Sequence, residues 1–316
     1  MKPNRALDLS PLSVTDLLCT SALPPADIER IFATARALKA GRAVHTRVLE
    51  HKRLAMIFEK DSLRTRFTFE IGMHDLGGSA VFMDHRDARL GSRESVKDMA
   101  KNFARWVHGV VARTFKHKAL EELAQHAGIP VINGLSDHVH PCQALSDFFT
   151  LTEKWGELRG RTVTYVGDGN NTCHALIHTA VKLGVHIRVC SPEGYAPNPR
   201  VVEEAKRTAR QTGSEVTLLR DPRPAVDGAD AVYTDTWASM GQEDEIEERH
   251  GVFAAYQVDE ALMARAKPDA VFMHCLPAHR GKEVTQEVMD GPQNIAYDIA
   301  ENRLHVQKAI LALLLR

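Results

Sequence analysis

The sequence predicts an α/β protein with two doubly wound parallel-sheet domains joined by bridging helices. Short β-rich runs alternate with longer helical patterns along all 316 residues, which is typical of parallel sheets covered by helices. This length suits two domains, each large enough to bury its own core. A helical pattern over 141–155 stays apolar past Phe148 and Phe149, and we expect it to join the domains.

In the first half of the chain, apolar runs predict four strands. They lie near 53–58, 79–83, 108–112 and 129–132. Helices are expected near 63–75, 93–106 and 118–127. Gly77-Gly78 and Gly128 follow two of these patterns and mark helix ends, since glycine readily adopts the left-handed conformation found there.

The second half repeats the alternation. Strands are expected near 162–166, 186–190, 215–219, 231–234, 270–274 and 294–297. Helices are expected near 172–184, 199–212, 222–227 and 259–266, and a last one from about 301 to 315. The acidic stretch 243–248 lacks the Asp/Asn/Gly spacing of a calcium loop, and we interpret it as a solvated loop or helix face.

Composition excludes several classes of function. A formal net charge of −1 argues against a nucleic-acid or anionic-membrane surface. No apolar run approaches the ~18 residues that span a bilayer, and the N-terminus lacks an apolar signal segment. The five cysteines are scattered and lack Cys-x-x-Cys spacing, which favours a reducing cytoplasm over disulfides or a zinc site.

The junction after the first strand carries the strongest chemical signal. Its polar residues are Ser62, Arg64, Thr65 and Arg66. Ser62 can cap the following helix, whose free N–H groups and dipole attract anions, and arginines bind phosphate tightly. Solvated arginines on a capped helix are the alternative, but four such groups in five residues favour a phosphate site.

Further candidates follow other predicted strands, because ligands bind at the carboxyl ends of parallel strands. Arg113 closes one strand, although alone it would fit an ordinary surface arginine. His140 precedes the helix that begins at Pro141, and Gln143 lies on its first turn. An imidazole can donate to an oxyanion and a carboxamide can accept from an NH2 group, but a solvated histidine at a helix start fits equally well.

Gly167 and Gly169 resemble half of a dinucleotide fingerprint, but Thr172 stands where the third glycine belongs. An NAD(P)-dependent oxidoreductase would also need an acidic residue after the next strand, where only Glu193 is near. That alternative leaves the Ser62 junction unexplained. The amides of the neighbouring asparagines suit a small polar ligand instead.

Two more strands end in reactive side chains. Asp235 can pair with a substrate ammonium and Ser239 can add hydrogen bonds, or Asp235 can simply cap a turn. Cys275 ends another buried run, where most cysteines only pack. His274 does not by itself activate this thiol, because neighbours on a strand point to opposite faces.

Taken together, these motifs resemble the aspartate/ornithine carbamoyltransferase family, from the strand before Ser62 to the segment 300–303. The resemblance implies a carbamoyl phosphate-binding domain over 1–148, with a C-terminal helix 300–316 packing back on it, and an ornithine-binding domain over 149–299. It implies transfer of a carbamoyl group to the δ-amine of L-ornithine, giving citrulline and phosphate. No metal or cofactor is implied.

The resemblance also implies a set of site residues and a homotrimer with active sites between subunits. The carbamoyl phosphate site would comprise Ser62, Leu63, Arg64, Thr65, Arg89, Arg113, His140, Gln143, Cys275, Leu276 and Arg303. The ornithine site would comprise Asn171, Asp235, Ser239 and Met240. Arg113, His140, Asp235 and Cys275 would take part in catalysis.

Two residues depart from the family pattern. Leu63 stands where the family usually has threonine, a small change if only its backbone N–H is used. Arg89 stands where the family usually lends a glutamine to the neighbouring subunit, and it can reach the phosphate or point elsewhere. Putrescine as acceptor, a non-catalytic binding protein, and an anabolic or a catabolic direction all remain open.

Overall fold

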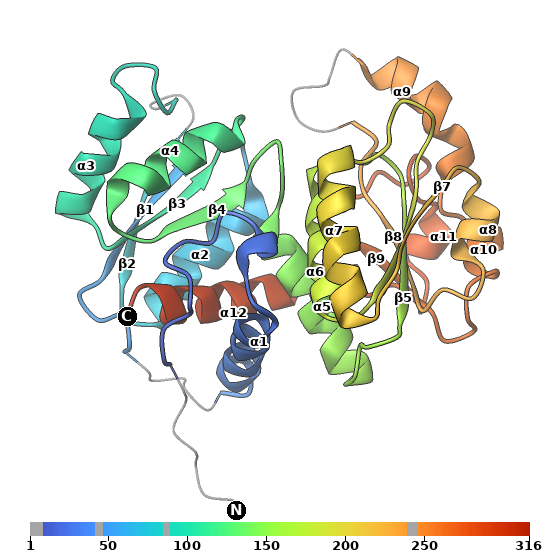
Figure 1. Ribbon diagram of the computed structural model, residues 1–316, viewed down its shortest axis with the longest axis horizontal. Coiled ribbons are helices and arrows are strands. Elements are labelled where there is room, and N and C mark those ends of the chain that lie inside the picture. Colours follow the sequence, from blue (N-terminus) through green and yellow to red (C-terminus); the bar gives the residue numbers. More distant parts are fainter. Residues whose placement is uncertain (1–8, 42–46, 85–88, 239–244) are drawn as a thin grey trace, which may run out of the picture. The chain divides into compact units, whose positions relative to one another are not determined.

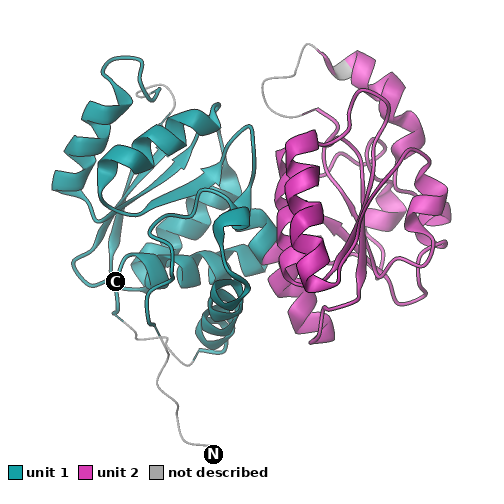
Figure 2. Cartoon of the chain, in the orientation of Figure 1, with its two compact units in different colours: residues 1–145, 301–316 teal, residues 146–300 magenta. Residues whose placement is uncertain are grey.

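The computed structural model describes residues 9–41, 47–84, 89–238 and 245–316 and confirms the α/β class (Figure 1). The chain forms two compact units: residues 1–145 with 301–316, and residues 146–300 (Figure 2). Each unit contains one parallel sheet. Both boundaries between the units fall inside helices, α5 (Pro141–Trp155) and α12 (Ala296–Leu314).

The sheet of the first unit has the strand order β2-β1-β3-β4. Its strands are β1 (Arg53–Phe58), β2 (Ser79–Met83), β3 (Gly109–Arg113) and β4 (Val131–Leu135). Phe58 pairs with Arg113, and Arg113 pairs with Leu135. The residues that follow β1, β3 and β4 therefore emerge together at the carboxyl end of this sheet.

Helices cover the first sheet because consecutive residues of β1 and β3 are buried, so both faces of these strands must be shielded from water. Ala55 and Ile57 of β1, with residues of β3, form a buried cluster with two helices. These helices are α3 (Val96–Trp106) and α4 (His117–Ala127), while α1 (Pro25–Lys39), α2 (Leu63–Asp75) and η1 (Thr20–Ala22) complete the unit. α2 packs closely on α12, where a Cβ on Gly72 would lie 3.2 Å from Cγ of Lys308.

The sheet of the second unit has the strand order β7-β6-β5-β8-β9. Its strands are β5 (Thr162–Val166), β6 (His186–Cys190), β7 (Val216–Leu219), β8 (Ala231–Thr234) and β9 (Val271–His274). Thr234 of β8 pairs with Val166 on one side and with His274 on the other. Asp235 and Cys275 therefore leave neighbouring strands side by side.

The second unit also contains helices of very different lengths. They are α6 (Asn171–Lys182), α7 (Pro199–Thr212), α8 (Pro222–Val226), α9 (Ile246–Phe253), η3 (Ala254–Tyr256), α10 (Glu260–Met263) and α11 (Gln286–Met289). The helix expected near 259–266 is thus limited to the four residues of α10. Part of the acidic stretch, Glu247 and Glu248, lies in the first turn of α9.

The strand expected near 294–297 is wrong. Asn294 makes only an isolated bridge to Phe272, and its side-chain Oδ1 accepts a hydrogen bond from Ala296 N at 2.8 Å. The last helix consequently begins at Ala296, five residues before the expected start at 301. A short apolar run such as this one does not distinguish a strand from the start of a helix. Among the described residues, no helix is both long and apolar enough to cross a bilayer.

Gly169 is a position where the fold tolerates no side chain. A Cβ there would overlap the backbone N of Pro197 and lie 2.5 Å from the carbonyl carbon of Ala196. The backbones approach this closely because Gly169 N donates to Tyr195 O at 2.8 Å. The partial dinucleotide fingerprint thus has a packing explanation.

Gly169→Ala should destabilise the protein by about 1–3 kcal/mol or more, because the added methyl group displaces backbone atoms rather than a flexible side chain. Gly251→Ala is the matched control, since a Cβ there meets nothing within 4 Å. Urea unfolding of both variants measures the difference. Equal stabilities would contradict the close approach at Gly169.

Candidate active site

The N-terminus of α2 lies directly after the carboxyl end of β1. Ser62 has extended backbone angles, and its Oγ accepts a hydrogen bond from Thr65 N at 3.2 Å. Thr65 is buried, Arg64 is half-buried, and Leu63 is 69% exposed. The helix start has the expected cap, and the exposed Leu63 side chain agrees with a role for its backbone alone.

Arg303 connects three helices of the first unit. This side chain is 2% exposed, and its Nη1 donates to Gln143 Oε1 at 2.6 Å while Nη2 donates to Thr65 Oγ1 at 2.9 Å. α12, α5 and α2 thus meet at one guanidinium. We call Thr65, Gln143 and Arg303 the Arg303 cluster. The sequence predicted all three for one site, and the structure brings them together.

His140 lies in a strongly positive environment. Burial lowers its pKa well below the ordinary value of 6.5, and the charges of Arg303, Arg113 and Arg64 lower it further. Its Nδ1 is buried and meets no hydrogen-bond partner among the described residues. The imidazole is therefore neutral near pH 7 and retains one N–H for donation.

Arg66 does not join Arg64 at the helix start, which corrects the expectation that all four polar residues contribute to one phosphate site. Its Cζ lies 3.8 Å from the ring centroid of Phe82, and its Nε lies 3.6 Å from Glu70. Two residues along an α-helix are separated by about 200° around its axis, so both guanidiniums cannot share one face.

The second unit presents a different set of polar groups. Asp235 is buried; its Oδ1 accepts from Thr236 N at 2.8 Å and from Cys275 Sγ at 2.9 Å. Its Oδ2 accepts from Asn170 Nδ2 at 3.1 Å. We call Asn170, Asp235 and Cys275 the Asp235 cluster. Three donors hold this carboxylate in one orientation, and its negative charge suits a cationic ligand.

Asn170 has a structural role that the sequence did not distinguish from that of Asn171. Asn170 is the N-cap of α6, and its Oδ1 accepts from Thr172 N and Cys173 N. Its amide nitrogen then contacts Asp235, whereas Asn171 is half-buried and its Oδ1 accepts from Thr172 N at 2.9 Å. Both asparagines thus lie at the start of α6.

Sequence reasoning missed a buried ion pair beside this cluster. Arg249 of α9 is 5% exposed; its Nη1 lies 2.8 Å from Asp168 Oδ2 and donates to Trp237 O at 2.9 Å. Burial raises the pKa of Asp168, although the Arg249 hydrogen bond and charge lower it. No local pattern marks a pair that is 81 residues apart.

The remaining predicted residues have separate positions. Leu276 has a left-handed backbone (φ 60°), and its N donates to His274 Nδ1 at 2.8 Å. Arg89 is exposed, with Cζ 5.1 Å from the ring centroid of Phe115. Ser239 and Met240 lie outside the described residues.

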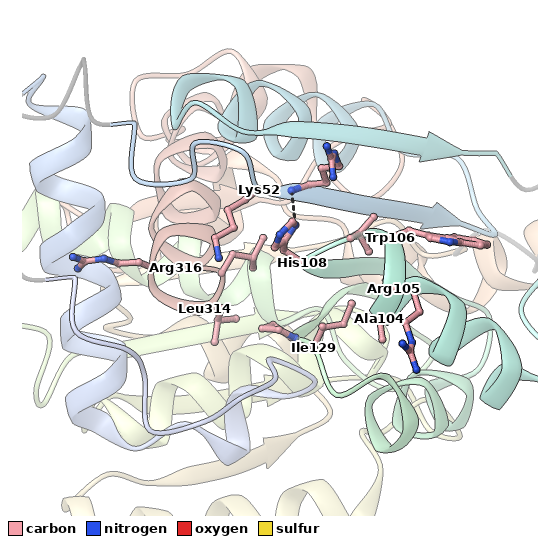
Figure 3. Close-up of a pocket in the computed structure, with 12 residues that line it drawn as sticks. Lys52, Ala104, Arg105, Trp106, His108, Ile129, Leu314 and Arg316 are labelled. Atoms are coloured by element: carbon pink, nitrogen blue, oxygen red, sulfur yellow. Dashed lines mark hydrogen bonds between the residues drawn. The ribbon is translucent and has the colours of Figure 1, made fainter.

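A pocket of about 480 Å³ opens at the other, amino end of the first sheet (Figure 3). Its lining includes apolar groups such as Ile129 and Leu314. Arg105 and Arg316 also line it, but Figure 3 shows their guanidiniums pointing apart rather than converging. This pocket contains none of the residues that the sequence predicted for the site.

Comparison with known proteins assigns the chain to a class of two-domain transferases. Residues 15–153 match the profile "Aspartate/ornithine carbamoyltransferase, carbamoyl-P binding domain", and residues 159–314 match "Aspartate/ornithine carbamoyltransferase, Asp/Orn binding domain". The chain therefore belongs to the aspartate/ornithine carbamoyltransferase family.

The similar proteins carry a more particular name. The chain is 48% identical over 306 residues to the ornithine carbamoyltransferase of Thermococcus kodakarensis, covering 96% of this chain and 97% of that protein. It is 50% identical over 300 residues to the ornithine carbamoyltransferase of Bacillus subtilis, covering 95% and 93%. The solved ornithine carbamoyltransferase from Pyrococcus furiosus superposes with a TM-score of 0.93 at 48% identity, covering 97% and 98%.

The environment of His140 predicts how stability depends on pH. Its folded pKa is lowered, so below about pH 6.5 the unfolded chain takes up a proton that the folded chain does not. This residue should therefore reduce stability as pH falls below 6.5, by at most about 1.4 kcal/mol per pH unit, and have no effect above that range.

Unfolding free energies of the wild type and of His140→Asn, measured from pH 5 to 8, would isolate this contribution. The wild-type value should decline more steeply below about pH 6.5 than that of the variant. Parallel curves, or an NMR titration of the His140 ring near its ordinary pKa, would contradict the neutral imidazole.

Proposed function

We propose that this protein is an ornithine carbamoyltransferase, which transfers the carbamoyl group of carbamoyl phosphate to the δ-amine of L-ornithine and releases L-citrulline and phosphate. The single observation that carries the proposal is the Arg303 cluster, with neutral His140 beside it, at a helix N-terminus that suits a phosphate. Identities near 50% to proteins of that name support the same reaction.

Carbamoyl phosphate would bind to the first unit. Its phosphate would accept hydrogen bonds from Ser62, Arg64, Thr65 and the backbone N–H of Leu63, where the helix dipole adds positive charge. Its carbamoyl group would lie near the residues that follow β3 and β4. The proposed contacts there are Arg113, His140, Gln143 and Arg303. Cys275, Leu276 and the Arg89 that a neighbouring subunit contributes would complete the site.

L-ornithine would bind to the second unit. Asp235 would accept from the α-ammonium, since its carboxylate is already oriented by Thr236, Cys275 and Asn170. Asn171, Ser239 and Met240 are further proposed contacts. A buried carboxylate disfavours aspartate as acceptor, because aspartate would bring two like charges to this cluster. Putrescine, which carries ammonium groups but no carboxylate, is the second candidate.

The reaction requires a neutral amine, although an alkylammonium of this kind has a pKa of about 10.4 in water. After loss of that proton, the nitrogen attacks the carbonyl carbon and forms a tetrahedral oxyanion. Arg113, Thr65 and His140 would stabilise this oxyanion, and removal of one such donor costs about 3 kcal/mol of barrier. The C–O bond to phosphate then breaks, the nitrogen passes its extra proton to a phosphate oxygen, and Arg64 would balance the charge gained by the leaving phosphate.

Most of the acceleration in this mechanism comes from binding. Holding both substrates in reactive orientation can supply roughly 7–11 kcal/mol. Cys275 and Asp235 would orient the amino acid and would not attack, since the thiol already donates to the carboxylate. No covalent intermediate is needed.

We further propose a homotrimer in which Arg89 approaches the active site of a neighbouring subunit, working in the biosynthetic direction. The family resemblance supports the assembly, and the name of a 48%-identical relative from Pyrococcus furiosus, "Ornithine carbamoyltransferase, anabolic", supports the direction. A light-scattering mass of one 35.1 kDa chain would contradict the trimer. Cytoplasmic location remains a prediction of the cysteine pattern.

Phosphate release should be measured with carbamoyl phosphate and, separately, L-ornithine, putrescine, N-acetylornithine and L-aspartate. Of the four acceptors, we expect only ornithine to give turnover, with one citrulline formed for each phosphate released, because Asp235 needs an α-ammonium partner. Faster turnover with putrescine would move the assignment to that acceptor. Failure with every acceptor would leave a binding role only.

Arg64→Ala should raise the KM for carbamoyl phosphate about 10–100-fold, because a charged hydrogen-bond donor to the phosphate is lost. Arg66→Ala, two residues away on the same helix, is the matched control and should change this KM little, since Arg66 stacks on Phe82. Steady-state kinetics at saturating ornithine distinguish the two. Equal increases in the KM for carbamoyl phosphate in the two variants would contradict the assignment of Arg64, and not Arg66, to the phosphate.

A further inference from the structure

Glu59 is a buried carboxylate directly after β1 that the proposed chemistry does not use. It is 8% exposed, and its backbone N donates to Arg113 O at 2.8 Å. Its Oε1 accepts from Leu90 N at 2.9 Å, and its Oε2 accepts from Phe115 N at 2.8 Å. One side chain thus connects two segments that are 31 and 56 residues away in the sequence.

Both connected segments carry residues of the proposed carbamoyl phosphate site. Leu90 directly follows Arg89, and Phe115 lies two residues after Arg113. Glu59 itself lies three residues before Ser62. Because Phe58 pairs with Arg113 in the sheet, the carboxylate emerges where these segments leave the strands.

The Phe115 ring extends this connection to two cations. Lys60 Nζ lies 4.6 Å from the ring centroid, and Arg89 Cζ lies 5.1 Å from it. Both distances are within the range of cation–π attraction. Glu59 therefore fixes the backbone of Phe115, and the ring of Phe115 in turn orients Arg89.

A carboxylate near an anion site opposes ligand binding if it acts directly, since like charges repel. Both oxygens of Glu59 are instead engaged by backbone N–H donors. A carboxylate can accept at two oxygens at once, whereas a carboxamide accepts at one and donates at the other. Glutamine would therefore break one of the two connections while keeping the same shape.

We propose that Glu59 is a positioning residue for the carbamoyl phosphate site, because it holds the segments of Arg89 and Arg113 in fixed positions at the carboxyl end of the first sheet. The inference rests on the proposed function. Glu59 would act on the ligand only through other residues. Its replacement should accordingly change the KM for carbamoyl phosphate and not the KM for ornithine.

The test compares Glu59→Gln with Asp27→Asn, a matched control in the same unit. Asp27 is also buried, at 3% exposure, and its Oδ2 accepts from Ser13 N and Ser13 Oγ at 2.9 and 2.6 Å. Glu59→Gln should raise the KM for carbamoyl phosphate about tenfold and leave the KM for ornithine within about twofold. Asp27→Asn should change neither KM, even where it lowers stability.

A double-mutant cycle with Arg89→Ala tests the path of the effect. If Glu59 acts through Arg89, the double variant should raise the KM for carbamoyl phosphate by less than the product of the two single-variant increases. An increase equal to that product would overturn the inference. So would a Glu59→Gln enzyme with the same two KM values as Asp27→Asn. Phe115→Leu, which keeps the backbone N–H, serves if Glu59→Gln does not fold, and should also raise only the carbamoyl phosphate KM.

Calorimetric titration with carbamoyl phosphate distinguishes a failure of the proposed function from a failure of the positioning role of Glu59. A wild-type protein that does not bind carbamoyl phosphate would overturn the proposed function. Binding that is equally tight in the wild type and in Glu59→Gln would overturn the positioning role alone.

Discussion

The interaction on which the first unit most depends is the pair of hydrogen bonds from Arg303. This guanidinium comes from the last helix and reaches residues 238 and 160 positions earlier in the chain. It orients the Thr65 hydroxyl and the Gln143 carboxamide, and it adds to the positive field around His140. Leaving this buried charged donor without one of its hydrogen-bond partners costs about 1–3 kcal/mol or more, so fold and site are stabilised by the same bonds.

Local signals in the sequence predicted the elements that hold the site. Three helices have the predicted bounds: α2, which Ser62 caps, α5, which begins at Pro141, and α7. Where a signal was ambiguous, the prediction was wrong. The apolar run at 294–297 suits a strand or a helix start equally, and the Asn294 side chain decides for the helix.

Side-chain direction and long-range contacts were harder to predict. Helical geometry separates Arg66 from Arg64 and was available from the sequence alone. The partners of Glu59 and Arg249 were not, because the donors and acceptors they meet are distant in the chain and carry no shared pattern. Resemblance to a family identifies residues that contact the ligand. Glu59 and Arg249 instead contact other residues of the protein, so the resemblance did not identify them.

The arginines that gather near His140 repel one another in the absence of an anion, and the fold holds them together at a cost in stability. A bound anion removes that repulsion and stabilises the folded state in proportion to RT ln(1 + [L]/Kd). Inorganic phosphate, the proposed product, is also a common buffer. If phosphate occupies this site as the proposed function requires, the apparent melting temperature depends on the solution as well as on the chain, and values obtained in phosphate and in amine buffers describe two different states of occupancy.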